Sequence, residues 1–157
     1  MKVHEVAPDV DTAVWLAGAQ FADAFMIAVE GPPLNARIAA QRMMGRSPRW
    51  VETLLSLRNA LVAPFGLKTS GAGEKSPGGL IGVFPVLSET PERLVAGFDD
   101  HHLDFRVVVD VEASGQAQQV TATTLVLTHN WLGRAYLAII MPFHRLVVRS
   151  LLRQVAA

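Results

Sequence analysis

The sequence predicts an α+β domain in which a long C-terminal helix packs on an antiparallel sheet. Residues 103–112 alternate apolar with mostly polar side chains, which is the period of a strand that buries one face. Residues 131–155 lack that alternation and spread their apolar side chains over a wide sector of a helical wheel. We expect residues 1–157 to form a single domain, because two halves of this chain would be too small for sound cores.

Composition excludes several classes of function. The 14 Lys plus Arg residues balance the 14 Asp plus Glu residues, whereas nucleic-acid-binding proteins carry a basic excess, so no nucleic-acid partner is expected. The absence of cysteine excludes disulfides and thiol catalysis. No phosphate-binding glycine loop or common hydrolase motif is present, so no cofactor is expected. The N-terminus lacks a signal-peptide pattern, and the expected location is the cytoplasm.

The first part of the chain is predicted to form one strand and two short helices. The strand covers residues 21–29 and ends before two prolines. Segments 34–44 and 47–62 have the apolar spacing and the terminal residues of helices, and 68–79 is expected to form an exposed loop. The odd positions of the strand share one face, with mainly alanines between them: Phe21, Asp23, Phe25, Ile27 and Val29.

Four further strands are predicted at residues 80–87, 93–98, 103–112 and 118–129. A two-residue turn at Gly115 and Gln116 would join the last two, because glycine adopts the positive φ that a type II′ turn requires. That register gives three cross-strand pairs: Phe105 with Val126, Val107 with Thr124, and Val109 with Ala122.

The C-terminal helix is expected to turn a narrow basic sector to solvent and a wide apolar sector, which includes Phe143, to the sheet. Leu152 is the apolar exception within the basic sector. Pro142 falls on the basic side, and a proline bends a helix away from itself, so the helix should be concave toward the sheet. Arginines recur along the whole length, which argues against a membrane span; a solvated face is the simplest interpretation of them, and contact with anionic lipid or a protein is the alternative. These arginines are Arg134, Arg145, Arg149 and Arg153.

The predicted order of elements resembles the helix-grip order of START-like (SRPBCC) domains. Leu-Asp-Phe-Arg at 103–106, Thr-His-Asn-Trp-Leu-Gly-Arg-Ala-Tyr-Leu at 128–137 and Ile-Met-Pro-Phe-His-Arg-Leu-Val-Val-Arg-Ser at 140–150 look like the bacterial domain-of-unknown-function 2867 family. The resemblance implies a helix-grip fold with two short helices and the long C-terminal helix on the concave face of the sheet. It also implies a small hydrophobic ligand between sheet and helix, as in START-like relatives. Because members of this family are found fused behind nucleotide-binding reductase domains, it further suggests a reductase partner.

The leading hypothesis is therefore a ligand-binding domain with no catalytic residue and no metal site. One alternative is a cyclase- or hydratase-type enzyme that uses His144 or His102 as an acid/base group. Another is an interaction module that forms a homodimer or binds a reductase; half of the residues are hydrophobic, which suits a lined cavity or a buried oligomer surface. The residues expected to line the ligand site are Phe105, Val107, Val109, Thr124, Val126, Ile140, Phe143, His144 and Val147.

One titratable cluster, at residues 99–104, is dense enough to suggest metal binding or proton transfer. It contains Asp99, Asp100, His101, His102 and Asp104. Adjacent residues of a strand point to opposite faces, so His101 and His102 are not expected to share one ion. A solvated entry to a strand is the simpler interpretation of this cluster.

Overall fold

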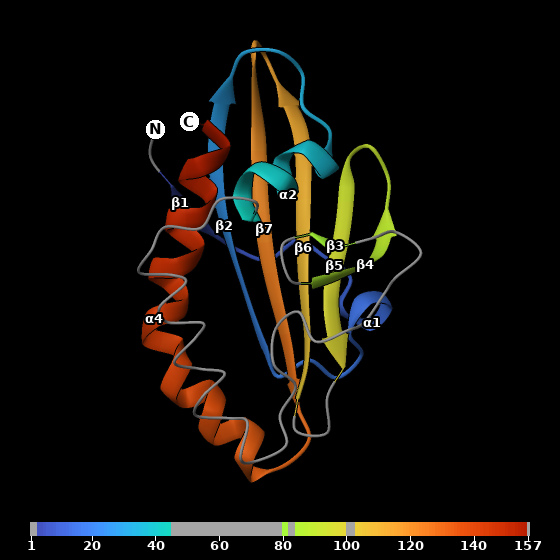
Figure 1. The fold of residues 1–157 in the computed structure, drawn as a ribbon, viewed down its shortest axis with the longest axis vertical. Coiled ribbons are helices and arrows are strands. Elements are labelled where there is room, and N and C mark those ends of the chain that lie inside the picture. Colours follow the sequence, from blue (N-terminus) through green and yellow to red (C-terminus); the bar gives the residue numbers. More distant parts are fainter. Residues whose placement is uncertain (1–2, 45–79, 82–83, 100–102, 157) are drawn as a thin grey trace.

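The computed structural model describes residues 3–44, 80–81, 84–99 and 103–156. Within these residues, seven strands form one antiparallel sheet in the order β1-β2-β7-β6-β5-β4-β3 (Figure 1). The strands are β1 His4–Val6, β2 Phe21–Glu30, β3 Leu80–Ile81, β4 Phe84–Glu89, β5 Arg93–Asp99, β6 Leu103–Ser114 and β7 Ala117–Thr128. The helices are α1 Thr12–Trp15, α2 Ala36–Met44 and α4 Trp131–Ala156.

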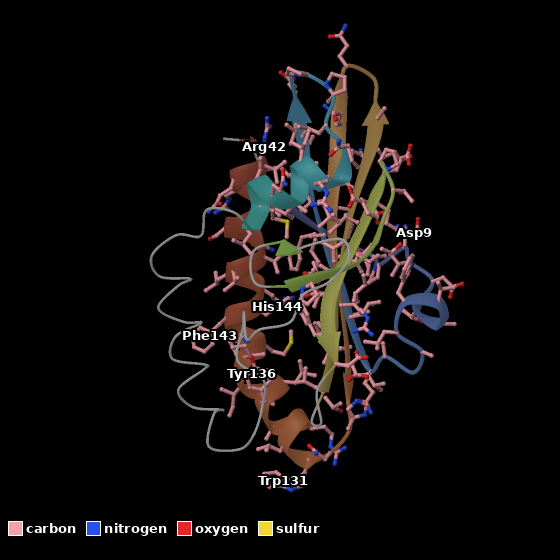
Figure 2. The ribbon with its side chains drawn as sticks, turned by 45° about the vertical axis from the view of Figure 1, so that its right-hand side comes forward. Asp9, Arg42, Trp131, Tyr136, Phe143 and His144 are labelled. Atoms are coloured by element: carbon pink, nitrogen blue, oxygen red, sulfur yellow. The ribbon has the colours of Figure 1, made fainter. Side chains whose placement is uncertain are left out.

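The order of the elements confirms the predicted helix-grip fold, with α4 on the concave face of the sheet. The helix α4 packs against β2 and β7, whereas α2 packs against β5, β6 and α4. Figure 1 shows α2 crossing the half of the sheet nearest the turn between β6 and β7. Figure 2 shows α1 on the opposite side of the sheet from α4.

The hairpin of β6 and β7 has the predicted turn and register. Ser114 pairs with Ala117, which leaves a two-residue turn, and Gly115 has a φ of 63°. No non-glycine residue in the described part of the chain has a positive φ, so Gln116 fits a type II′ turn and not type I′. The pairs of Phe105 with Val126 and of Val107 with Thr124 both form, as does the third predicted pair.

The prediction of a single strand at 80–87 is wrong. Residues in this range form two strands, β3 and β4, that pair antiparallel with each other, with Leu80 opposite Pro85 and Ile81 opposite Phe84. Both short strands are rich in apolar residues, and a continuous apolar run does not reveal where a chain reverses. The predicted helix at 47–62 and loop at 68–79 lie outside the described residues.

A glycine permits the close approach of β5 to β6. A Cβ atom added to Gly97 would lie 2.0 Å from the backbone oxygen of Phe105, a distance at which the two strands would have to separate. The strand β6 therefore keeps its place beside β5 because residue 97 has no side chain.

The main core fills the space between the sheet and the two larger helices. The helix α2 begins after Asn35, whose side chain accepts a hydrogen bond from the Ile38 amide at 2.8 Å. It contributes small residues to the core, which lets its backbone lie close to the sheet. The buried side chains of this core include Phe25, Ile27, Val29, Ala36, Ala39, Ala40, Met43, Leu94, Val107, Val109, Val148, Leu152 and Val155.

The orientation of α4 differs from the expected one. Leu152, the apolar exception of the basic sector, is fully buried, while Phe143 is 43% exposed. Arg149 is half-buried, and its guanidinium lies 5.5 Å from the centre of the Phe25 ring. Arginine stems are apolar enough to flank a core, so the basic sector lies partly toward β1 and β2 and the helix is rotated accordingly. Pro142 is exposed, as expected.

Candidate functional site

The sheet residues predicted to line a ligand site lie together on the concave face. Cross-strand partners share a face, and pairing extends from β6 through β7 to β2. The result is three rows that each cross these strands. The rows are Phe105–Val126–Phe21, Val107–Thr124–Asp23 and Val109–Ala122–Phe25.

The middle row ends in a buried acid. Asp23 is 7% exposed, although the neighbours that share its face of β2 are aromatic or aliphatic. Among the described residues, none donates a hydrogen bond to its carboxylate oxygen Oδ2. Such an unsatisfied buried acceptor is rare in folded proteins and costs stability, so it requires an explanation.

The imidazole of His144 reaches this carboxylate from α4. Its Nε2 atom lies 3.2 Å from Oδ1 and 3.1 Å from Oδ2 of Asp23, and hydrogen-bond geometry is met only with Oδ1. The Phe21 ring meets the imidazole edge-on, with ring centres 5.9 Å apart. Figure 2 shows His144 on the sheet side of α4 and Phe143 on the other side. An Asp–His pair of this kind can orient a polar ligand or transfer a proton.

The side chains of the concave face are fully buried at one end and only half-buried at the other. Near α2, the side chains of Phe25, Ile27 and Val109 are fully buried. Toward the start of α4, by contrast, inward-facing apolar residues are only half-buried. This second set comprises Phe21, Phe105, Leu137, Ile140 and Met141. Asp23 and His144 lie at the boundary between the two ends.

The nine predicted lining residues differ in their burial and in whether they face the sheet. Val107, Val109, Thr124 and Val126 are buried on the concave face, with Phe105 half-buried beside them. On α4, Ile140, His144 and Val147 are half-buried, and His144 contacts Asp23 of β2. Phe143 does not face the sheet. Its expected place followed from the assumed rotation of α4, which was wrong.

Sequence reasoning missed Asp23. The signal was present, because strand alternation places this aspartate in line with Phe21 and Phe25 on an otherwise apolar face. An acid at such a position needs a partner from another element, and sequence spacing does not identify that partner.

Several other charged residues form pairs outside the core. On the opposite face of the sheet, Asp104 lies 3.0 Å from Nε2 of His129, and Arg106 pairs with Asp99 at 2.7 Å. His129 is therefore engaged with an acid, while Asn130 caps α4 by accepting a hydrogen bond from the Gly133 amide. Asp100, His101 and His102 lie outside the described residues.

Two further observations limit the chemistry of charged groups in the described part of the chain. No group of three or more His, Cys, Asp or Glu residues there could hold a metal ion. A hydrogen bond from Arg37 lowers the pKa of the Glu89 carboxyl, and this exposed pair ties α2 to β4.

The comparisons with known proteins assign the family. A family model described as "Protein of unknown function (DUF2867)" matches residues 15–151. The chain belongs to this family. The resemblance drawn from segments 103–106, 128–137 and 140–150 is thereby confirmed, and Asp23 and His144 both lie inside the part of the DUF2867 chain that the family model matches. A search of curated proteins gives no match.

Two solved structures resemble the DUF2867 chain at low identity. The crystal structure of Ara h 8.0201 is 9% identical, with a TM-score of 0.41, and the match covers 86% of this chain and 98% of that one. CalU16 from Micromonospora echinospora is 10% identical, with a TM-score of 0.33, and the match covers 86% of this chain and 80% of that one. At these TM-scores neither likeness bears on function.

Proposed function

We propose that this protein binds a small, mainly apolar molecule between the sheet and α4, with a hydrogen-bond donor of that molecule directed at Asp23. The observation that carries the proposal is the buried Oδ2 atom of Asp23, which accepts no hydrogen bond from the part of the chain that the structure describes. An ionised carboxylate only accepts hydrogen bonds, so a hydroxyl or N–H group of a ligand would satisfy it. A ligand of this chemistry would remove the cost of the unpaired acceptor.

The surroundings of Asp23 support an apolar body for this ligand. Phe21, Phe105 and Ile140 are half-buried near Asp23 and His144, and their exposed parts offer apolar surface to a bound molecule. Ligand sites commonly combine such surface with a few polar groups that set orientation. The helix-grip order also resembles START-like domains, whose members bind hydrophobic ligands, although a shared fold alone does not establish a shared function.

A thermal-shift experiment tests the proposal with naphthol and decanol as donor-bearing probes and naphthalene and decane as probes without a donor. A bound probe at about a hundredfold its dissociation constant should add roughly 2.7 kcal/mol of stability, which raises the melting midpoint of a domain of this size by roughly 5–10 °C. We expect this increase only with the donor-bearing probes.

The matched variants are Asp23→Asn and Asp104→Asn. Asp23→Asn replaces one acceptor oxygen by an amide, so affinity for the donor-bearing probes should fall about tenfold or more. Asp104→Asn makes the same chemical change on the opposite face and should leave affinity unchanged. Equal effects of both variants, or stabilisation by the donor-free probes alone, would contradict the role of Asp23. If no probe stabilises the wild-type protein, an interaction module that binds a second copy or a reductase becomes the better hypothesis.

The same Asp–His geometry favours a second candidate function, an enzyme of the cyclase or hydratase type. A carboxylate that holds one imidazole can position it as a general acid or base toward a bound substrate. The test is exchange of carbon-bound hydrogens of tetralone with deuterated water, followed by NMR. Exchange that exceeds the buffer rate and disappears in His144→Ala would support an enzyme, and exchange at the buffer rate leaves simple binding as the function.

A further inference from the structure

The cross-strand neighbour of the buried acid is a threonine. Thr124 of β7 pairs with Asp23 of β2, and directly opposed residues of an antiparallel pair place their Cβ atoms roughly 5 Å apart on the same face. Both side chains are buried, with 3% of Thr124 and 7% of Asp23 exposed. A hydroxyl group can donate one hydrogen bond and accept others, but that of Thr124 does not donate to Oδ2 of Asp23. An unpaired carboxylate oxygen and a threonine hydroxyl therefore lie close together beside the imidazole of His144.

This combination suits one chemical group better than others. A neutral hydroxyl of a ligand can donate to the Asp23 oxygen and at the same time accept a hydrogen bond from Thr124. An ionised carboxylate has no donor for Asp23 and brings a second negative charge to the first, which is unfavourable in a buried site. An ammonium group could donate to Asp23, but it has no acceptor for Thr124, and its remaining N–H donors would need further acceptors.

The packing on either side of Asp23 sets the direction in which such a ligand can lie. Toward α2, Phe25 and Val109 are fully buried, so a ligand that extended this way would displace closely packed side chains of the core. Toward the start of α4, Phe21 and Phe105 are only half-buried. The hydroxyl is therefore the inner end of the ligand, and the apolar body extends toward the start of α4.

We propose that Asp23 and Thr124 select a neutral alcohol or phenol, which binds between the sheet and α4 with its hydroxyl group innermost. The inference rests on the proposed function and narrows it. A donor for Asp23 is common to hydroxyl and ammonium groups, whereas an acceptor for Thr124 distinguishes the two. Thr124 is thus the residue that selects a hydroxyl, and Asp23 excludes ionised carboxylic acids.

Titration calorimetry at neutral pH with decanol, decanoate and decylamine tests this selection. The three probes share an unbranched carbon chain, and at this pH decanoate is an anion and decylamine a cation. The wild-type protein should bind decanol about tenfold or more tightly than either ion, because each ion leaves a buried group without its hydrogen bond. Asp23→Asn should raise the affinity for decanoate, since it removes the like charge and supplies an amide donor. Loss of structure cannot produce such a gain.

Two adjacent threonines give a matched pair of variants. Thr124→Val removes the hydroxyl on the concave face and should weaken decanol binding roughly three- to tenfold. Thr123→Val makes the same change at a buried residue on the opposite face of β7 and should leave decanol binding unchanged. Thr124→Ser should restore most of the affinity that Thr124→Val loses, and a thermal melt of each variant checks that it is folded.

The outcomes separate this inference from the proposed function. Decylamine that binds the wild-type protein as tightly as decanol, or equal losses in Thr124→Val and Thr123→Val, would overturn the selection of a hydroxyl while a donor at Asp23 remains. Decanoate that binds as tightly as decanol would overturn the exclusion of acids. If neither decanol nor naphthol binds the wild-type protein, the proposed function fails together with this inference.

Discussion

The molecule contains two Asp–His pairs with almost the same geometry in different surroundings. On the concave face, Nε2 of His144 lies 3.1 Å from Asp23, and the two side chains are 16% and 7% exposed. On the opposite face, Nε2 of His129 lies 3.0 Å from Asp104, and the exposures are 39% and 15%. Distance alone therefore does not distinguish a candidate site from a surface ion pair.

The two pairs differ in how well water can solvate a side chain that has lost its partner. Around the outer pair, solvent can replace a lost partner, so the pair contributes little to stability. Around the inner pair, a lost partner leaves a polar group without compensation, and the cost is several times larger. If the proposed function is right, a bound ligand supplies the remaining hydrogen bond of the inner carboxylate.

Removal of one histidine from each pair should give the largest contrast. His144→Ala leaves the Asp23 carboxylate buried without its donor, so the free energy of unfolding should fall by roughly 3–5 kcal/mol. His129→Ala should lower it by less than about 1 kcal/mol. Urea unfolding measures both values, and similar losses in the two variants would show that water reaches Asp23.

Replacement of both members of the inner pair should be milder than removal of one. Asp23→Leu/His144→Leu leaves no polar group unpaired, and buried ion pairs can often be replaced by apolar residues without loss of stability. We expect this double variant to unfold within about 1 kcal/mol of the wild-type free energy while it loses affinity for naphthol. A double variant as unstable as His144→Ala would indicate that the pair holds α4 in place by specific geometry.

The smallest expected contrast between the two pairs is the effect of salt on the coupling energy within each pair. Exposed charges are screened over about 10 Å at an ionic strength near 0.1 M and more strongly at higher salt, whereas buried pairs are screened much less. The coupling energy between Asp104 and His129, measured by a double-mutant cycle, should therefore decrease when salt is raised to about 1 M. The coupling between Asp23 and His144 should change little, and an equal decrease in both would contradict the difference in burial.

The parts of the fold that are determined by residues close together in the sequence could be predicted from it. The β6–β7 register followed from strand alternation and one turn glycine, both of which are local signals. The rotation of α4 could not be predicted, because a helical wheel separates basic from apolar sectors but does not show that the Arg149 stem lies against Phe25. His144 was recognised as a candidate, whereas Asp23 became one only when the fold brought the two together.

The long sequence separation of the inner pair has a consequence for how the chain folds. His144 and Asp23 are 121 positions apart, and β2 joins the sheet only by pairing with β7 from the far end of the chain. Closure of such long loops costs more entropy than formation of the β6–β7 hairpin, so the hairpin is expected to form first. The buried carboxylate and the imidazole meet when the two ends of the chain come together. A nascent chain that ends before His144 therefore contains every strand of the described sheet but lacks the pair of Asp23 and His144.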